Sequence, residues 1–193
     1  VLTKMLEVQK VGERPYFNMI LTLSTHNPFL INNTAFYEKK FDNQVNDDRL
    51  SDSQKTWALQ YKKQLVTVMN LDHAVEDFFK TYRKRSDFAH TIFIITGDHS
   101  MPEIPLQEKI DRYRVPLIIY SPLLKQPHRF ENIVSHFDIA PSILAYYRKN
   151  YGLKTPAKVA WMGKGLKSTI EINSKSFPLM QSKDQIVDFV AGK

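Results

Sequence analysis

Three short apolar runs without polar alternation constrain the fold of this chain more than any other feature. They cover 16–23 (YFNMILTL), 90–97 (HTIFIITG) and 115–120 (VPLIIY). Their content of β-branched and aromatic residues indicates strands, and the lack of alternation indicates strands that are covered on both faces. Because helical patterns lie between the runs, the sequence predicts an α/β fold with a mostly parallel sheet sandwiched by helices.

Helix signals are clearest in the middle of the chain. Residues 51–54 (SDSQ) form a capping-box pattern, and the apolar residues that follow recur at helical spacing, which predicts the longest helix over 53–84. A short helix is expected within 1–11. Another is expected after Asp138, which is suited to cap it, with Pro141 tolerated in the first turn.

The other segments carry weaker signals. The polar stretch 32–52 is predicted to be a long loop with at most a short strand over 35–41. Near the C-terminus, 168–172 and 176–180 are predicted to pair as antiparallel strands, and 184–190 to form a final helix.

Composition indicates a folded chain, with 42% hydrophobic residues. We expect a single domain over 1–193, with 1–150 as the α/β core and 151–193 as a small, partly antiparallel subregion. No cysteine is present, which excludes disulfides, thiolate metal sites and a cysteine nucleophile. The chain begins with Val1 and lacks a signal-like region, so we expect it to be a piece of a longer protein.

The net charge of +7 is concentrated in one stretch, because 139–170 contains no acidic residue. Its basic residues are Arg148, Lys149, Lys154, Lys158, Lys164 and Lys167. The aromatic residues Tyr146, Tyr147, Tyr151 and Trp161 are interleaved with them. Such a stretch is typical of a solvated face, but it is also compatible with a non-catalytic module that binds an anionic polymer by charge and stacking. No nucleic-acid-binding motif accompanies it.

Candidate chemistry follows two of the apolar runs. Asp98 and His99 come directly after the second run, where the backbone turns and both side chains can reach one cation. A carboxylate and an imidazole suit Zn²⁺ or Mn²⁺, and with more oxygen ligands Mg²⁺ or Ca²⁺. The alternative interpretation is that Asp98 only caps the turn and His99 is an ordinary polar residue.

Two further histidines need interpretation. His26 follows the first run, and its near-neutral pKa suits anion binding or proton transfer, although a lone histidine in a turn often has neither role. His73 lies inside the predicted long helix beside Asp72, where we expect a buried hydrogen bond rather than catalysis.

The order of four blocks resembles the C-terminal half of the sulfatase-like branch of the alkaline phosphatase superfamily. The blocks are LTLSTHNPF (21–29), FIITGDHS (93–100), VPLIIYSP (115–122) and VSHFDIAPSIL (134–144). The resemblance spans roughly 14–166 and is greatest to lipoteichoic acid synthase-type phosphoglycerol transferases.

The resemblance implies a metalloenzyme in which Asp98 and His99 ligate a divalent cation, of Mn, Mg, Ca or Zn, and His26 contacts the phosphate or sulfate of an ester substrate, including lipid-linked esters. It implies a scaffold role for the block 135–142. In such enzymes a hydroxyl or formylglycine nucleophile and further acidic ligands precede the first of these blocks. Here 1–15 supplies only Thr3, Glu7 and Glu13, so the site is expected to be half a site without a nucleophile.

Three expectations follow from the resemblance. The intact protein would form a covalent intermediate that water or an acceptor alcohol resolves, acting outside the cytoplasm and anchored to the membrane by upstream segments. The chain alone would be inactive, and it would self-associate through a sheet edge that the missing strand leaves uncovered. A relative that kept the fold and lost catalysis is the remaining alternative.

Overall fold

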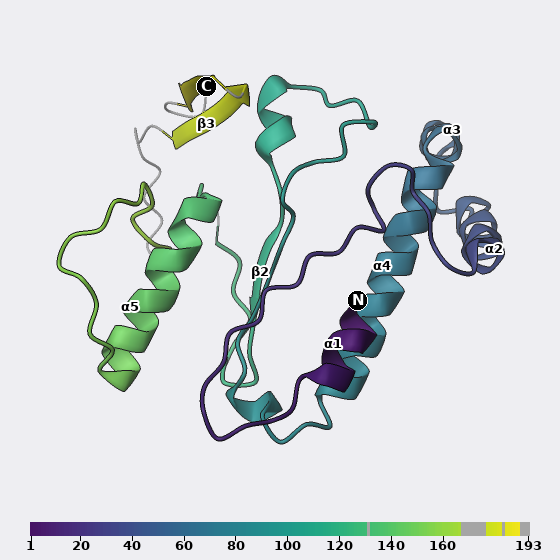
Figure 1. The fold of residues 1–193 in the computed structure, drawn as a ribbon. Coiled ribbons are helices and arrows are strands. Elements are labelled where there is room, and N and C mark those ends of the chain that lie inside the picture. Colours follow the sequence, from purple (N-terminus) through teal and green to yellow (C-terminus); the bar gives the residue numbers. More distant parts are fainter. Residues whose placement is uncertain (131, 167–176, 183, 190–193) are drawn as a thin grey trace. The chain divides into compact units, whose positions relative to one another are not determined.

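The structure is a computed structural model that describes residues 1–130, 132–166, 177–182 and 184–189 (Figure 1). The chain forms two compact units, Val1–Lys125 and Gln126–Lys193, and each is described by itself. The first unit contains the segments expected to carry the chemistry. The prediction of a single domain over 1–193 stays a prediction.

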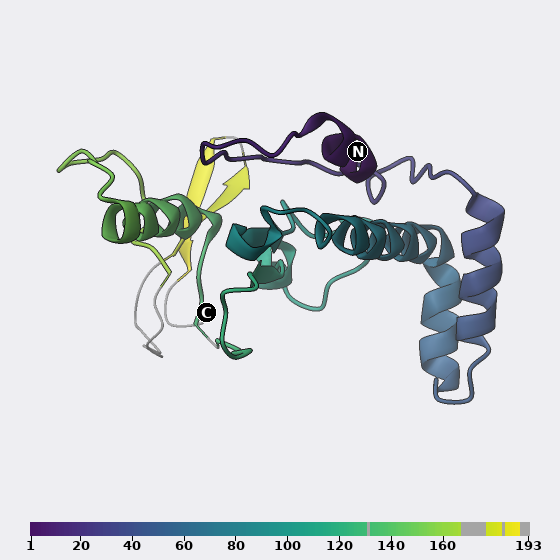
Figure 2. The same cartoon turned by 90° about the horizontal axis from the view of Figure 1, so that it is seen from below.

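Three helices form the core of the first unit. They are α2 (Thr34–Val45), α3 (Asp52–Gln60) and α4 (Lys62–Tyr82), and α2 and α3 lie side by side near the N-terminal end of α4 (Figure 2). Tyr37, Phe41 and Val45 recur every four residues on α2 and are buried against Val66. The prediction of a loop over 32–52 is therefore wrong, because a helical apolar spacing lies within this polar stretch.

The predicted capping box is confirmed at the start of α3. The Gln54 backbone N–H donates to Ser51 Oγ at 3.3 Å, and the Ser51 N–H donates to Gln54 Oε1 at 2.9 Å. The helix predicted over 53–84 is divided in two, because Tyr61 departs from helical geometry at φ −107°, ψ 24°. The second part, α4, is the longest helix of the described chain, as expected. The short N-terminal helix is also confirmed, as α1 (Leu2–Val8), which packs on α4.

Two of the three apolar runs form strands, but in an antiparallel arrangement. β1 (Phe93–Thr96) pairs with β2 (Leu117–Tyr120), with Phe93 opposite Tyr120. The connection contains only the short 3-10 helix η2 (Lys109–Tyr113) rather than a crossover helix, so the chain returns in the opposite direction. The mostly parallel sheet sandwiched by helices is not what the described residues form.

The end of α4 packs on this two-stranded sheet through aromatic rings. The Phe79 ring lies 4.9 Å from that of Phe93 and 5.6 Å from that of Tyr120, while Tyr82 lies 5.0 Å from Phe93. The short 3-10 helix η1 (Phe88–His90) adds Phe88 to the cluster. Offset and edge-on contacts of this kind stabilise a core beyond the area they bury. They fix β1, and with it the start of the Asp98 turn, to α4.

The first apolar run differs from the expectation of a buried strand. Residues 16–23 have no strand partner among the described residues, and Phe17 and Met19 are 73% and 89% exposed. Leu21 and Leu23 are exposed as well, so alternate apolar side chains face solvent. The prediction of a covered strand here is wrong for this chain, because strand formation needs a partner that local sequence does not supply.

A polar network anchors the start of that run. Arg85 makes a two-point ion pair with Asp87, at 3.0 Å for each contact, and donates to the Gln9 carbonyl at 2.8 Å. The Tyr16 hydroxyl donates to Asp87 and lies 3.1 Å from the Tyr82 hydroxyl. Burial, followed by the bond to Asp87, raises the pKa of Tyr16 above its ordinary range. This network holds Tyr16 against the end of α4.

The second unit contains the 3-10 helix η3 (His136–Asp138), the helix α5 (Ile139–Tyr151), and the antiparallel strands β3 (Phe177–Ser182) and β4 (Gln185–Phe189). α5 confirms the helix predicted after Asp138, but the predicted cap is wrong, because the Asp138 side chain makes no capping hydrogen bond to the helix. The helix predicted over 184–190 is wrong, since 185–189 form the strand β4, which pairs with β3. The strand predicted over 168–172 lies outside the described residues.

Asp138 joins two parts of this second unit. Its buried carboxylate accepts the Ser135 N–H at 3.0 Å through Oδ2, and the N–H groups of Lys164 and Gly165 at 2.8 and 3.1 Å through Oδ1. The Ser142 hydroxyl donates to the Asp138 carbonyl at 2.6 Å and accepts the Leu166 N–H at 2.7 Å. These contacts support the scaffold role that the resemblance implies for 135–142.

Within the described ranges, no helix combines the length and apolar character that crossing a bilayer requires.

Candidate metal-binding site

A tight turn presents His26 after the exposed run. The His26 N–H donates to the Leu23 carbonyl at 3.1 Å, and the Phe29 N–H donates to the His26 carbonyl at 2.7 Å. Phe29 closes the turn with a buried side chain and a left-handed φ of 59°. The imidazole itself stays exposed. The buried Phe29 side chain thus fixes one side of the turn, and the His26 imidazole stays accessible on the other.

A second turn presents Asp98 and His99 where β1 ends. Asp98 Oδ1 accepts the His99 N–H at 3.0 Å, which is the turn-capping contact considered from the sequence. The other oxygen, Oδ2, lies 3.5 Å from His99 Nε2. The side chains of Asp98 and His99 are 69% and 53% exposed. Capping therefore occupies one carboxylate oxygen, and the second faces the imidazole.

Backbone carbonyls fix the chemistry of both imidazoles. His99 Nδ1 lies 2.7 Å from the Ser100 carbonyl, and His26 Nδ1 lies 2.8 Å from the Asn27 carbonyl. A carbonyl only accepts hydrogen bonds, so in each neutral ring Nδ1 carries the proton and Nε2 keeps its lone pair. This is the tautomer in which a histidine can bind a metal through Nε2.

The two histidines, far apart in sequence, lie together. The ring centroids of His26 and His99 are 6.4 Å apart and the rings are nearly perpendicular at 76°. All three site residues predicted from the sequence therefore lie in one small region of the first unit. Their roles in binding remain predictions.

The pair at 98–99 fits part of a divalent cation's coordination shell. Asp98 Oδ2 and His99 Nε2 face each other and offer one oxygen and one nitrogen. In the part of the chain that the structure describes, no group of three or more His, Asp or Glu residues could hold a metal ion. The donor set is therefore compatible with a cation, and the described residues supply two ligands of the four or more that such ions take.

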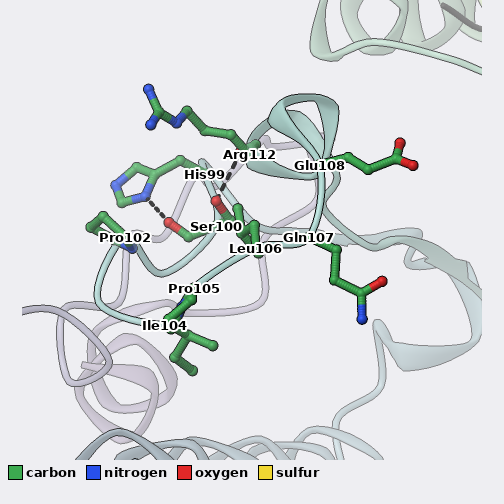
Figure 3. A pocket seen from close by; sticks show the side chains of 9 residues that line it. All are labelled: His99, Ser100, Pro102, Ile104, Pro105, Leu106, Gln107, Glu108 and Arg112. Carbon is green, nitrogen blue, oxygen red and sulfur yellow. Dashed lines mark hydrogen bonds between the residues drawn. The ribbon is translucent and has the colours of Figure 1, made fainter.

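A pocket of about 640 Å³ adjoins His99 (Figure 3). Its walls come from the loop between β1 and β2. They are lined by His99, Ser100, Pro102, Ile104, Pro105, Leu106, Gln107, Glu108 and Arg112. Ser100 Oγ donates to the Arg112 carbonyl at 2.9 Å and so ties the two ends of the loop together.

The sequence did not identify this pocket or Arg112. One available signal was the length of the connection between the second and third apolar runs, with Pro102 and Pro105 within seven residues of Asp98. The buried hydrogen bond predicted between His73 and Asp72 is wrong: the half-buried His73 ring lies 2.9 Å from the Tyr37 hydroxyl through Nδ1 and 3.5 Å from Asp77 Oδ2 through Nε2. It joins α4 to α2.

Comparison with known families identifies the class of the chain. The Sulfatase family model matches residues 1–147, which include both turns and the pocket. The chain therefore belongs to the sulfatase family. Membership points to hydrolase or transferase chemistry, typically with a divalent metal. No curated protein and no solved structure matches the chain significantly.

Proposed function

We propose that this chain is the C-terminal part of a metal-dependent catalytic domain that hydrolyses or transfers sulfate or phosphate esters. The observation that carries the proposal is the position of the Asp98–His99 pair directly after β1, with the His26 ring 6.4 Å from that of His99. Within the family, we propose the phosphoglycerol transferase branch, on the four ordered sequence blocks from 21 to 144.

The proposal gives each residue a defined task. Asp98 Oδ2 and His99 Nε2 would hold the cation, of Mn, Mg, Ca or Zn, with the Ser100 carbonyl keeping His99 in the required tautomer. The bound cation would act as a Lewis acid on the ester. His26, when protonated, donates from Nε2 to a non-bridging oxygen of the phosphate or sulfate group.

The nucleophile is proposed to come from outside this chain. An oxygen nucleophile would attack phosphorus or sulfur, the alcohol would leave, and water or an acceptor alcohol would resolve the covalent intermediate. We further propose that the intact protein acts outside the cytoplasm on ester substrates, lipid-linked ones included, and is anchored to the membrane by upstream segments. The chain alone is then inactive and binds metal weakly.

Two measurements test the proposal. In the intact protein, D98A should remove ester hydrolysis or transfer, and unchanged activity would refute the assignment. With the chain alone, titration with Mn²⁺ or Zn²⁺ should give weak binding that H99A weakens further. Tight, stoichiometric binding by the chain alone would contradict the half-site.

The second candidate is a binding module for anionic polymers on the basic stretch. On α5, the Tyr147 ring lies 5.8 Å from that of Tyr146 and 5.4 Å from that of Tyr151. The rings pack on each other, which reduces the surface open to stacking with a ligand. A salt-dependent gel shift with an anionic polymer, unaffected by D98A, would favour this candidate over the enzyme.

A further inference from the structure

Arg112 is unusual among the charged residues around the pocket. Its guanidinium has no hydrogen-bond or ion-pair partner among the described residues, whereas Arg114, two positions on, lies 3.6 Å from Asp111. The Glu108 carboxylate, which also belongs to the pocket lining, accepts the Asp111 N–H at the start of η2. Neither acid forms an ion pair with Arg112 among the described residues, so the Arg112 guanidinium is open to a ligand at a pocket that Glu108 also lines.

The charge lies on the side of the pocket that His99 occupies. In Figure 3 the side chains of Arg112 and His99 extend toward one side of the loop, while those of Gln107 and Glu108 extend away from them. The apolar side chains of Ile104, Pro105 and Leu106 line another part of the pocket. The pocket thus combines Arg112 on the His99 side with an apolar surface, and the acidic Glu108 extends to the other side.

His99 lies close to His26 and also lines the pocket together with Arg112. His26 lies close to His99 but is not part of the pocket lining, whereas Arg112 is part of it. In the proposed function, the sulfate or phosphate group of the ester is bound by His26 and by the cation that the 98–99 pair would hold. Arg112 is then available for a different anionic group of the same ligand.

We propose that Arg112 is a specificity-determining residue for substrates that carry a second anionic group, with the uncharged linker lying against the apolar wall of the pocket. This inference rests on the proposed function for the position of the first anionic group. A planar guanidinium suits two-point contact with phosphate or sulfate oxygens, which makes a doubly anionic ester the preferred ligand class.

Binding of defined probes to the full chain with Mn²⁺ present tests the inference. Calorimetric titration would compare hexyl phosphate with hexane-1,6-diol bisphosphate and shorter diol bisphosphates, and the corresponding sulfates in parallel. The bis-anionic probe of the best length should bind about tenfold more tightly, equivalent to about 1.4 kcal/mol. R112A should reduce that advantage to within about twofold and leave binding of the single-anion probe unchanged. The ester class that shows the Arg112-dependent advantage identifies the second anion.

The matched control is R114A, which removes an exposed arginine outside the pocket lining. It should keep the full advantage. The inference is overturned if neither probe class shows an advantage, if R112A leaves it intact, or if R112A weakens single-anion and double-anion probes equally.

D98A separates this inference from the proposed function. If D98A weakens both probes while R112A has no selective effect, the proposed function stands and the role of Arg112 is refuted. If R112A is selective while D98A changes nothing, Arg112 binds anions as inferred and the metal-site assignment fails.

Discussion

The helical core and the candidate site of the first unit are built in opposite ways. In the core, Tyr37, Phe41 and Val45 are buried against Val66, and partner groups lie on neighbouring helices. At the site, His26, Asp98 and His99 are exposed, and their orienting contacts come from backbone groups one residue away. The residues that stabilise the first unit are therefore largely separate from those of the candidate site, so that substitutions can affect one set without the other.

The largest effect that tests this separation is expected at Asp98. In the intact protein, D98A should lower kcat by about a thousandfold, because it would remove one of the two proposed cation ligands. Since the side chain is exposed and makes only local contacts, the thermal unfolding midpoint should stay nearly unchanged. D48A, at an exposed acid away from the site, is the control for activity. A large loss of stability in D98A would show that site and core are not separate.

The reverse pattern is expected at Asp87. D87A leaves the Arg85 guanidinium without its two-point partner at a pair whose side chains are 14% and 15% exposed, and should lower the free energy of unfolding by about 3 kcal/mol. Chemical denaturation measures this. D77A removes an exposed acid from α4 and should cost well below 1 kcal/mol. Equal losses in the two variants would refute a special role for the network.

The ionisation of Asp87 predicts that the stability of the chain depends on pH. Burial opposes ionisation of Asp87, but the hydrogen bonds from Arg85 and Tyr16 outweigh it, so that the pKa of the carboxyl is lower in the folded chain. Its contribution to stability is therefore complete above about pH 4, the ordinary range of the group, and is lost as the pH falls through the lowered folded pKa. Unfolding measured between pH 6 and pH 2 should show a steeper acid decline for the wild type than for D87A.

The exposed run at 16–23 predicts self-association of the chain. Phe17 and Met19 present apolar area of the kind that unpaired strands use to pair with another chain. A double substitution, F17S with M19S, should weaken association about tenfold in light-scattering dilution series. L59S, at an exposed leucine of α3, is the control. A wild-type chain that stays monomeric over a wide concentration range contradicts the prediction.

The smallest effect is expected at the start of α3. S51A removes the acceptor for the Gln54 N–H and should cost about 1 kcal/mol of unfolding free energy. S86A, at an exposed serine in the turn after α4, should be nearly neutral. Identical effects of the two substitutions would show that the capping box does not stabilise α3.

Local signals account for the parts of the fold that could be predicted. The capping box at Ser51, the helix after Asp138 and the strand character of 93–96 and 117–120 depend on residues near one another in sequence. Strand direction at β1–β2 and the uncovered state of 16–23 depend on which segments meet, which single-sequence patterns do not encode. α2 was missed because its polar residues concealed the four-residue spacing from Tyr37 to Val45.

The candidate site also contains residues that the sequence could predict and residues that it could not. His26, Asp98 and His99 could be proposed because each follows an apolar run, where chain turns expose side chains. Arg112 could not, because its relevance depends on how the loop between β1 and β2 folds back, with Ser100 bonded to the Arg112 carbonyl. Residue spacing in the sequence does not show where a loop folds back on itself.

The backbone contacts that Asp138 makes on either side of α5 indicate where the second unit tolerates insertions. The Asp138 carboxylate binds the backbone before α5, at Ser135, and after the loop 152–163, at Lys164 and Gly165. A Cβ on Gly163 would overlap the Phe137 carbonyl, so the C-terminal end of this loop has no room to shift. The loop 152–163 is itself largely exposed. Because loop length changes closure entropy only slowly, an affinity tag inserted near Ala157 should leave α5 intact. Changes of length within 152–163 should likewise leave α5 in place.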